Sequence, residues 1–312
     1  MKILITGGLG FVGSHLAKQL LKNNHDVTIV TKSLKKKNNV SEITKKLTIL
    51  KADVSKQKPI DKIFKKYSPD VIIHLAGQTS HTKSFENVTA DLDTNSRSTL
   101  LLLEKIRTKN LKCKFILGST FIVIGKPKKL PVDEYSECNP TSLYATHRLT
   151  SEHYCKIYSK VFGLKNIIFR ITNAYGPNEQ VIKNKNAINY LIHQSHINKK
   201  ITLYDGGKII RDFIYISDVI SAIQILIRKG KSGELYWIAS GNKTTLKNFS
   251  LHLKKQSNCS INYVKSPKYT KQVDVGDFFV NNNKIKKLGW KTKIPLNKGI
   301  NLTLNSFKKN QK

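Results

Sequence analysis

Three glycines near the start of the chain, Gly7, Gly10 and Gly13, separate a strand-like segment from a helical one. Glycine at these places lets the chain turn sharply, lets the backbone approach a pyrophosphate and lets the helix pack closely on the sheet. The first turn of the helix, which includes Phe11 and Val12, offers free N–H groups and the positive end of the helix dipole. The spacing therefore predicts a site for phosphate groups.

Short apolar segments alternate with longer helical patterns through the first half of the chain, which is the arrangement needed to position such a loop. The predicted strands are 2–6, 26–31, 47–51, 71–74, 114–119 and 166–171, and the main predicted helices are 11–23, 91–109 and 142–162. Ile and Val occupy both faces of the strands, as in a parallel sheet covered by helices. We therefore predict an α/β fold with a Rossmann-like, doubly wound parallel sheet.

The second half is less regular, with predicted helices at 187–196 and 217–228, an apolar segment at 209–216, a strand at 234–239 and a terminal helix. We expect a dinucleotide-binding domain over 1–172, with part of 210–240 added to it. Residues 173–312 are expected to form mainly a smaller, interleaved substrate-binding lobe.

The composition excludes several classes of protein. An apolar fraction of 39% is too high for a disordered chain, and no apolar run approaches the length of a membrane span. The N-terminus leads directly into a strand-like segment without a signal-peptide pattern. The four cysteines lack metal-ligand spacing. We expect a cytoplasmic protein with no metal site and no membrane partner.

The net charge of +35 raises the question of nucleic-acid binding. Only six of the 55 basic residues are arginine, the residue that grips phosphates and bases in a bidentate manner. Lysine, asparagine and isoleucine are all abundant and all have A/T-rich codons, so a compositional bias accounts for the charge. The lysines are also spread along the chain. We expect no nucleic-acid partner.

The Gly-x-x-Gly-x-x-Gly spacing resembles the loop of the short-chain dehydrogenase/reductase superfamily, and six further segments match that superfamily in order. They are 53–54, 74–77, 144–148, 170–177, 211–218 and 288–290. The segments at 170–177 and 211–218 resemble signatures of the extended branch, which contains NAD(P)-dependent nucleotide-sugar epimerases, dehydratases and reductases. The chain thus resembles the nucleotide-sugar epimerase/dehydratase family of extended short-chain dehydrogenases/reductases.

The resemblance implies that Tyr144 is the acid/base that moves a proton to or from a sugar hydroxyl and that Thr120 is its hydroxyl partner. A phenol with a pKa of about 10 must lose about three pKa units to do this at neutral pH, which requires about 4 kcal/mol of phenolate stabilisation. Arg148 stands where the family has Lys, one turn from Tyr144, and supplies a fixed positive charge there.

Two interpretations remain open because Arg and Lys are not interchangeable. The chain is either an active enzyme or a cofactor-binding relative that has weakened catalysis and acts as a sensor or scaffold. The dehydratases of the family carry acidic residues just after the threonine, where this chain has Phe121 and Ile122. We therefore expect no 4,6-dehydratase. The remaining reactions are reduction of a 4-keto sugar and 4-epimerisation.

The resemblance also implies which residues contact the ligands. The expected cofactor contacts are Gly7, Gly10, Phe11, Val12, Gly13, Thr31, Lys32, Asp53, Val54, Leu75, Ala76, Gly77, Ser119, Tyr144 and Arg148. NAD-selective members carry an acidic residue at the end of the second strand, and Thr31 followed by Lys32 favours NADP(H) over NAD instead.

A nucleotide-diphosphate sugar is the expected substrate, contacted by Gln78, Thr79, Asn173 and Arg211. The Arg211 guanidinium is expected on the diphosphate oxygens. The family also leads us to expect a homodimer, formed through a four-helix contact of segments 91–109 and 142–162.

Overall fold

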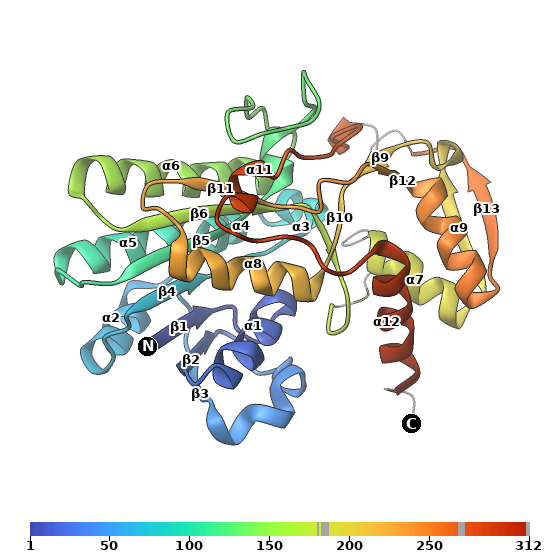
Figure 1. Cartoon of the computed structure of the whole chain (residues 1–312). Helices are drawn as coiled ribbons and strands as arrows, with labels where there is room; N and C mark the ends of the chain where they lie inside the picture. Colours follow the sequence, from blue (N-terminus) through green and yellow to red (C-terminus); the bar gives the residue numbers. More distant parts are fainter. Residues whose placement is uncertain (180, 182–186, 268–271, 310–312) are drawn as a thin grey trace. The chain divides into compact units, whose positions relative to one another are not determined.

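The computed structural model describes residues 1–179, 181, 187–267 and 272–309 (Figure 1). Its internal contacts divide the chain into two compact units. The first comprises Met1–Thr120, Ser142–Arg170 and Ile223–Tyr236. The second comprises Phe121–Thr141, Ile171–Ala222 and Trp237–Lys312.

The first unit is built on a seven-stranded sheet with the strand order β11-β6-β5-β4-β1-β2-β3. The strands are β1 (Lys2–Thr6), β2 (Asp26–Thr31), β3 (Thr48–Lys51), β4 (Val71–His74), β5 (Lys114–Thr120), β6 (Asn166–Ile171) and β11 (Leu235–Ile238). Adjacent strands from β3 through β2, β1 and β4 to β5 pair in parallel. Isoleucines in the middle of β1, β2, β4, β5 and β6 are fully buried, which forms the core that the sequence pattern predicts.

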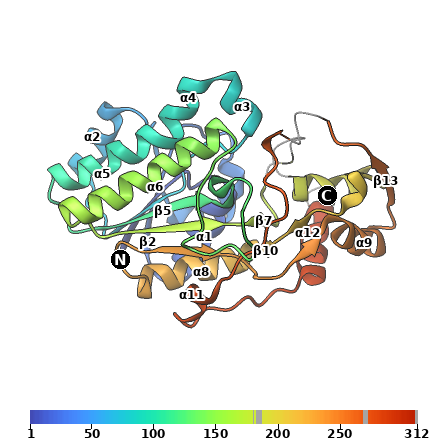
Figure 2. The ribbon, with the colours of Figure 1, turned by 90° about the horizontal axis from the view of Figure 1, so that it is seen from above.

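Helices cover both faces of this sheet. Helices α5 (Ser98–Thr108) and α6 (Leu143–Phe162) lie side by side on one face, and α1 (Phe11–Lys22) lies on the other (Figures 1 and 2). The remaining segments of the first unit are η1 (Lys37–Lys46), α2 (Gln57–Lys66), α3 (His81–Glu86), α4 (Val88–Leu92) and η2 (Asp93–Arg97). The Rossmann-like α/β prediction is confirmed.

Local differences from the prediction have physical causes. The predicted helix 91–109 is interrupted by η2, a single π-type turn that buries Asn95 and Ser96. The interruption contains buried polar side chains and no helix-breaking residue. The spacing of apolar residues therefore does not predict it. Segments η1 and α2 are rich in lysine, which hides their apolar positions, and they were not predicted.

Within its described residues, the second unit contains three two-stranded sheets. They pair β7 (Asn173–Tyr175) with β10 (Phe213–Tyr215), β9 (Ile210–Arg211) with β12 (Thr244–Thr245), and β8 (Lys200–Tyr204) with β13 (Ser260–Val264). Its helical segments are η3 (Phe121–Ile124), α7 (Ala187–Ile197), η4 (Asp205–Gly207), α9 (Leu246–Ser257), α11 (Asn283–Lys286) and α12 (Leu296–Lys309). Helix α8 (Ile216–Lys229) continues from this unit into the first. None of the described helices is long and apolar enough to cross a membrane.

One segment of the second unit lies in sequence between two parts of the first. The chain passes from the first unit to the second between Arg170 and Ile171 and also before Phe121–Thr141, which belongs to the second unit. This segment follows the end of β5 and is joined to the second unit by main-chain hydrogen bonds between Val132 and the segment 279–281. These hydrogen bonds join residues that are far apart in the sequence, so no local sequence pattern predicts them.

A buried ion pair ties α6 to the sheet in the first unit. Glu152 accepts hydrogen bonds from Arg170 Nε at 3.0 Å and from Arg170 Nη2 at 2.7 Å. The Ser119 hydroxyl donates to the same carboxylate at 2.5 Å. The two charged side chains are 0% and 2% exposed. Two charges this deeply buried are tolerated only because each satisfies the other.

A buried carboxylate has a comparable place in the second unit. Asp212 accepts hydrogen bonds from Ser240 N and Oγ, both at 2.8 Å, and from Gly241 N at 3.0 Å. Burial raises the pKa of Asp212 to about 6, against the opposing effect of these donors. The carboxylate therefore joins the segment after β11 to the segment between β9 and β10.

Replacing Glu152 by Ala should strongly destabilise the protein because it leaves the Arg170 charge buried without its carboxylate. We expect the free energy of unfolding in urea to fall by about 3–5 kcal/mol. The control is Glu42→Ala, which removes a carboxylate that is 74% exposed and paired with Lys18, and which should cost less than about 1 kcal/mol. Equal losses in the two variants would contradict this account.

Replacing Asp212 by Asn should change how stability depends on pH. The native pKa of Asp212 is raised from 3.8 to about 6, so its contribution to stability is present at low pH and is lost as pH rises through 6. We expect the free energy of unfolding of the wild type, relative to Asp212→Asn, to fall by about 2–2.5 kcal/mol between pH 4 and pH 7. Urea unfolding at several pH values measures this difference, and a constant difference would refute the assignment.

Candidate active site

The glycine loop between β1 and α1 is a tight cradle. Gly7 has a φ of 69°, in the region that favours glycine, and its N–H donates to Val30 O at 2.9 Å. A Cβ on Gly7 would lie 2.8 Å from Ala76 N, and one on Gly13 would lie 2.6 Å from Gly7 O. No side chain fits at either position, so the loop backbone remains open to a ligand.

Helix α1 presents its N-terminus at this loop. Gly10 is the N-cap residue, and no side chain caps the helix. The first hydrogen bond of the helix runs from Ser14 N to Gly10 O. The N–H groups of Phe11, Val12 and Gly13 therefore have no acceptor within the helix. They form the positive end of the helix dipole. These groups fit the pyrophosphate of a dinucleotide cofactor.

The strand ends beside the loop are held by a buried polar chain. Thr6 Oγ1 lies 2.7 Å from His74 Nδ1, and His74 Nε2 lies 3.1 Å from Ser98 Oγ. Thr6 Oγ1 also accepts a hydrogen bond from Ala76 N at 3.1 Å. Burial, with a smaller effect of Arg148, lowers the pKa of His74 to about 3, so this imidazole is neutral. It therefore positions the segment 75–77 rather than exchanging protons.

The ends of β2 and β3 carry the residues expected at the adenosine. Thr31 Oγ1 donates to Ser33 O at 2.9 Å, and Lys32 is exposed. Asp53 Oδ1 accepts from Ser55 N and Oγ at 3.0 and 2.8 Å, and Val54 is buried.

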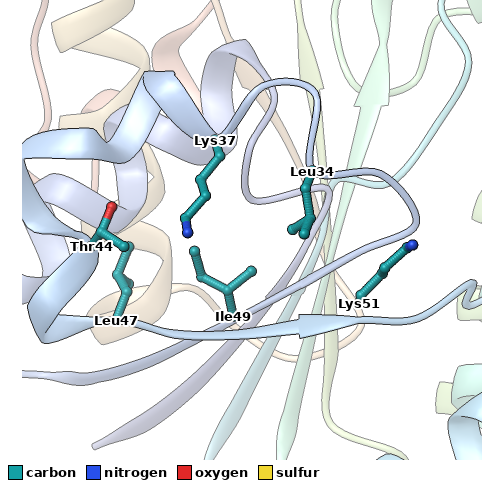
Figure 3. Close-up of a pocket in the computed structure, with 6 residues that line it drawn as sticks. All are labelled: Leu34, Lys37, Thr44, Leu47, Ile49 and Lys51. Carbon is teal, nitrogen blue, oxygen red and sulfur yellow. The ribbon is translucent and has the colours of Figure 1, made fainter.

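A pocket of about 280 Å³ lies at the same sheet edge. Leu34, Lys37, Thr44, Leu47, Ile49 and Lys51 line it. Figure 3 shows Lys37 reaching from η1 toward Ile49 on β3, with Lys51 at the carboxyl end of the same strand. No acidic side chain lines this pocket. Its two lysines make this pocket favourable for an anion.

Tyr144 and Thr120 meet at the end of β5. Tyr144 is 5% exposed and lies in the first turn of α6, which begins after the N-cap Ser142. Its phenol forms a hydrogen bond with the Thr120 side chain. Burial raises the pKa of Tyr144, while the charge of Arg148 and the Thr120 hydrogen bond act in the opposite direction. In the protein without ligands the phenol therefore holds its proton.

Arg148 has a buried but unpaired charge. Glu152 lies one turn further along α6 and could pair with it, but Arg170 and Ser119 occupy the Glu152 carboxylate. Arg148 is 5% exposed and forms no hydrogen bond or ion pair with any residue that the structure describes. A Cβ on Gly77 would lie 3.6 Å from Arg148 Nη1. The guanidinium is thus available to a ligand beside the segment 75–77.

Asp91, Asn95 and His147, which were not expected at the site, form a hydrogen-bond network beside it together with Gln78. Asp91 accepts hydrogen bonds from His147 Nδ1 at 2.6 Å, from Asn95 Nδ2 at 2.9 Å and from Gln78 Nε2 at 2.7 Å. Asn95 Oδ1 accepts from Gln78 N at 3.1 Å. The signal was present in the sequence, because Asp91 and Asn95 are four residues apart in a predicted helix that has an apolar inner face.

This network changes the interpretation of Gln78. Its side-chain amide, expected to face the sugar, donates to Asp91 and to Ser80 O, and its oxygen accepts from Ser80 N. The buried Asp91 carboxylate needs donors, and Gln78 supplies one. Thr79 is exposed, and Ser119, expected at the cofactor, donates its hydroxyl to Glu152.

The second unit contains the two other residues expected at the substrate. Asn173 donates from N and Nδ2 to Asp212 O at 3.1 and 3.2 Å. Arg211 is directed to Asp274, with Nη2 lying 2.9 Å from each carboxylate oxygen. The neighbouring Asp212 therefore brings these two residues together within this unit. No cluster of His, Cys, Asp or Glu suited to a metal ion occurs among the described residues.

Comparison with known proteins agrees with this geometry. Residues 3–239 match the family described as the NAD dependent epimerase/dehydratase family. The chain is 30% identical to a putative UDP-glucose 4-epimerase of Methanocaldococcus jannaschii, over 99% of both chains. It is 31% identical to a dTDP-D-glucose 4,6-dehydratase of Dictyostelium discoideum, over 99% of this chain and 82% of the relative.

The solved structure of a UDP-glucose 4-epimerase with UDP-glucose, from Thermotoga maritima, superposes with a TM-score of 0.92. The two proteins are 28% identical, and the match covers 100% of both chains. The family match extends over most of the sequence, including the glycine loop and the residues around Tyr144. The chain therefore belongs to the NAD dependent epimerase/dehydratase family.

Proposed function

We propose that the chain is a nucleotide-diphosphate-sugar oxidoreductase or epimerase that acts at C4 of a hexose, by 4-epimerisation or by reduction of a 4-keto group. The observation that carries this proposal is the arrangement of Tyr144, its hydrogen-bonded Thr120 and the unpaired guanidinium of Arg148. A buried phenol beside a fixed cation can give a proton to, or take one from, a sugar hydroxyl. The similarity to UDP-glucose 4-epimerases supports the same class of substrate.

Each residue has a separate part in this mechanism. The nicotinamide cofactor supplies or accepts hydride when it is bound. Thr120 holds the reacting sugar oxygen next to the Tyr144 phenol, and Tyr144 transfers the proton at that oxygen. Arg148 stabilises the phenolate after the proton has left and contributes hydrogen-bond donors to the cofactor ribose. Burial raises the pKa of the Tyr144 phenol, and the Arg148 charge and the Thr120 hydrogen bond oppose that rise, so Arg148 is the group of this chain that favours release of the proton.

Elimination of water is not part of the proposed activity. Relatives of this chain include 4,6-dehydratases, so the family alone does not decide the question. Phe121 and Ile122 support this exclusion, because they follow Thr120 and their side chains have no group that can exchange a proton. The Phe121 ring packs against Phe278, with ring centroids 4.9 Å apart, so this position serves packing.

For the cofactor, we propose NADP(H) in preference to NAD. The family is described as NAD dependent, and NAD is the alternative. Support for NADP(H) comes from Thr31 and the exposed Lys32, and from Lys37 and Lys51 in the pocket at the same sheet edge. A 2′-phosphate would meet cations there and no lining carboxylate.

We propose a homodimer on the evidence of exposed apolar side chains. Ile157, Val161 and Phe162 on α6 are 51%, 64% and 46% exposed. Helix α5 lies beside α6 and forms the rest of this face. A second copy of the chain would cover the same helices in the four-helix contact expected from the family.

Replacing Tyr144 by Phe should lower kcat by at least about 100-fold, because the proton donor is lost while the ring remains. The assays are interconversion of UDP-glucose and UDP-galactose, and NADPH oxidation with a 4-keto sugar nucleotide. The matched control is Tyr154→Phe, which changes a partly exposed tyrosine on the same helix and should leave kcat within about twofold.

Arg148→Lys completes this test and should be at least as active as the wild type. Unchanged turnover in Tyr144→Phe would refute the proposed acid/base, and an inactive Arg148→Lys would refute the role given to Arg148. A wild type that binds the dinucleotide but turns over no member of the substrate panel would establish the alternative, a sensor or scaffold.

The wild type should bind NADPH more tightly than NADH in a fluorescence titration. Lys32→Glu should weaken NADPH binding by about tenfold, since it places a negative charge at the 2′-phosphate, and should change NADH binding by less than about twofold. Lys22→Glu, at the far end of α1, controls for net charge. Tighter NADH binding by the wild type, or NAD carried through purification, would contradict the proposal and favour an epimerase.

A further inference from the structure

A buried carboxylate lies beside the proton-transfer residues and has no part in the mechanism described above. Asp91, on α4, is 1% exposed. Its Oδ2 lies 2.6 Å from His147 Nδ1, and its Oδ1 accepts hydrogen bonds from Asn95 Nδ2 at 2.9 Å and from Gln78 Nε2 at 2.7 Å. Three side chains therefore compensate for the burial of this one carboxylate.

His147 belongs to the part of α6 that carries the proposed proton-transfer residues. It follows Tyr144 by three positions and directly precedes Arg148. The three-residue spacing makes His147 and Tyr144 neighbours on the helix surface. His147 is 8% exposed, and α4 packs against α6. The imidazole therefore joins the start of α6 to Asp91 on α4.

The same network reaches the segment that follows β4. Asn95 Nδ2 donates to Gln78 O at 3.0 Å as well as to Asp91. A Cβ on Gly77 would lie 2.8 Å from Asn95 Oδ1 and 3.6 Å from Arg148 Nη1. The buried carboxylate and the unpaired guanidinium are thus both close to residues 77–78.

These two charges have opposite effects on the Tyr144 phenol. Burial is the main cause that raises the pKa of Tyr144, the Arg148 charge opposes it, and the Asp91 charge adds a smaller rise. A negative charge near a phenol disfavours the phenolate because like charges repel. An imidazole bound to the carboxylate can carry a positive charge and so offset this repulsion.

The other ionisable side chains on the elements packed against the start of α6 have other partners or are exposed. They are His81, Lys83 and Glu86 on α3, Asp93 and Arg97 on η2, Glu104, Lys105 and Arg107 on α5, and Lys114 on β5. Further along α6, Glu152 binds Arg170. Among the described residues, Asp91 is thus the carboxylate that contacts His147 and whose charge raises the pKa of Tyr144.

We propose that His147 is a positioning residue of the proton-transfer site, which binds Asp91 and offsets its charge so that Arg148 governs release of the Tyr144 proton. This inference rests on the proposed function, in which Tyr144 exchanges that proton. His147 acts through Asp91 and does not touch the substrate in this role. A protonated imidazole offsets the carboxylate more fully than a neutral one, so Tyr144 releases its proton less readily once His147 has lost its own.

The test is the ultraviolet absorbance of the Tyr144 phenolate between about pH 6 and pH 9, in the full chain saturated with NAD⁺ or NADP⁺. Each variant is compared with its own Tyr144→Phe counterpart, which isolates this phenol from the other tyrosines. His147→Gln keeps a donor for Asp91 but carries no charge, and it should raise the midpoint of ionisation by about 0.5–1 pH unit. Asp91→Asn should lower the midpoint by about the same amount.

Two further variants control for other causes. His153→Gln changes an exposed histidine on the same helix, and it should move the midpoint by less than about 0.2 pH unit. In the double variant Asp91→Asn, His147→Gln, the rise caused by His147→Gln should disappear, because the charge that His147 offsets is gone. A midpoint that His147→Gln leaves in place, or raises equally without Asp91, refutes the inference. Urea unfolding of each variant confirms that it is folded.

Turnover of UDP-galactose and of a 4-keto sugar nucleotide separates this inference from the proposed function. If the midpoints move as expected but no substrate is turned over, the effect of His147 on Tyr144 stands and the proposed activity is wrong. If Tyr144→Phe abolishes turnover and neither variant moves the midpoint, the inference is wrong and the activity stands. A wild-type complex in which Tyr144 keeps its proton up to about pH 9 contradicts both.

Discussion

The close approach of the glycine loop to the segment after β4 is the constraint on which the first unit depends. Strands β1 and β4 pair in parallel, so the chain leaves both at the same edge of the sheet. A Cβ on Gly7 would lie 2.8 Å from Ala76 N, which shows how little space separates the two segments. Thr6 and His74, at the ends of these strands, hold that distance with a buried hydrogen bond of 2.7 Å. The phosphate cradle is therefore a consequence of sheet pairing and of residues without side chains.

The distribution of buried charge along α6 decides which group is available for chemistry. Tyr144, Arg148 and Glu152 follow one another at four-residue spacing. Glu152 would be the natural partner of Arg148, yet Arg170 takes its carboxylate. Arg148 is thereby kept next to the Tyr144 phenol, where its charge opposes the effect of burial on the phenol pKa. A structural ion pair thus leaves a second arginine free of a protein acceptor among the described residues.

The net charge of +35 has little part in these sites. Most of the lysines lie on exposed segments, whereas Arg148, Arg170 and Arg211 and several of the acidic residues lie inside. Asp91, Glu152 and Asp212 are buried and receive several hydrogen bonds each. Burying an unpaired charge is costly, so the interior selects defined partners while the surface can accept a lysine-rich composition.

Much of the fold of the first unit could be predicted because its signals are local. The limits of β1, β2 and β4 follow from apolar runs, and the glycine loop follows from spacing alone. Tyr144 and Arg148 could be selected because both lie in one short motif on one helix. The interruption at η2 and the membership of Phe121–Thr141 could not be predicted, since each depends on contacts with distant segments.

By itself, the sequence determined the parallel α/β framework, the phosphate loop and the residues that resemble a proton-transfer site. Only the tertiary structure decided which charges have partners. Arg170 pairs with Glu152 across 18 positions, His147 with Asp91 across 56, and Arg211 with Asp274 across 63. The physical reason is that a residue's type sets the charge it carries, but only the fold brings an opposite charge within hydrogen-bond distance. That pairing leaves Arg148 open to a ligand and occupies Arg211.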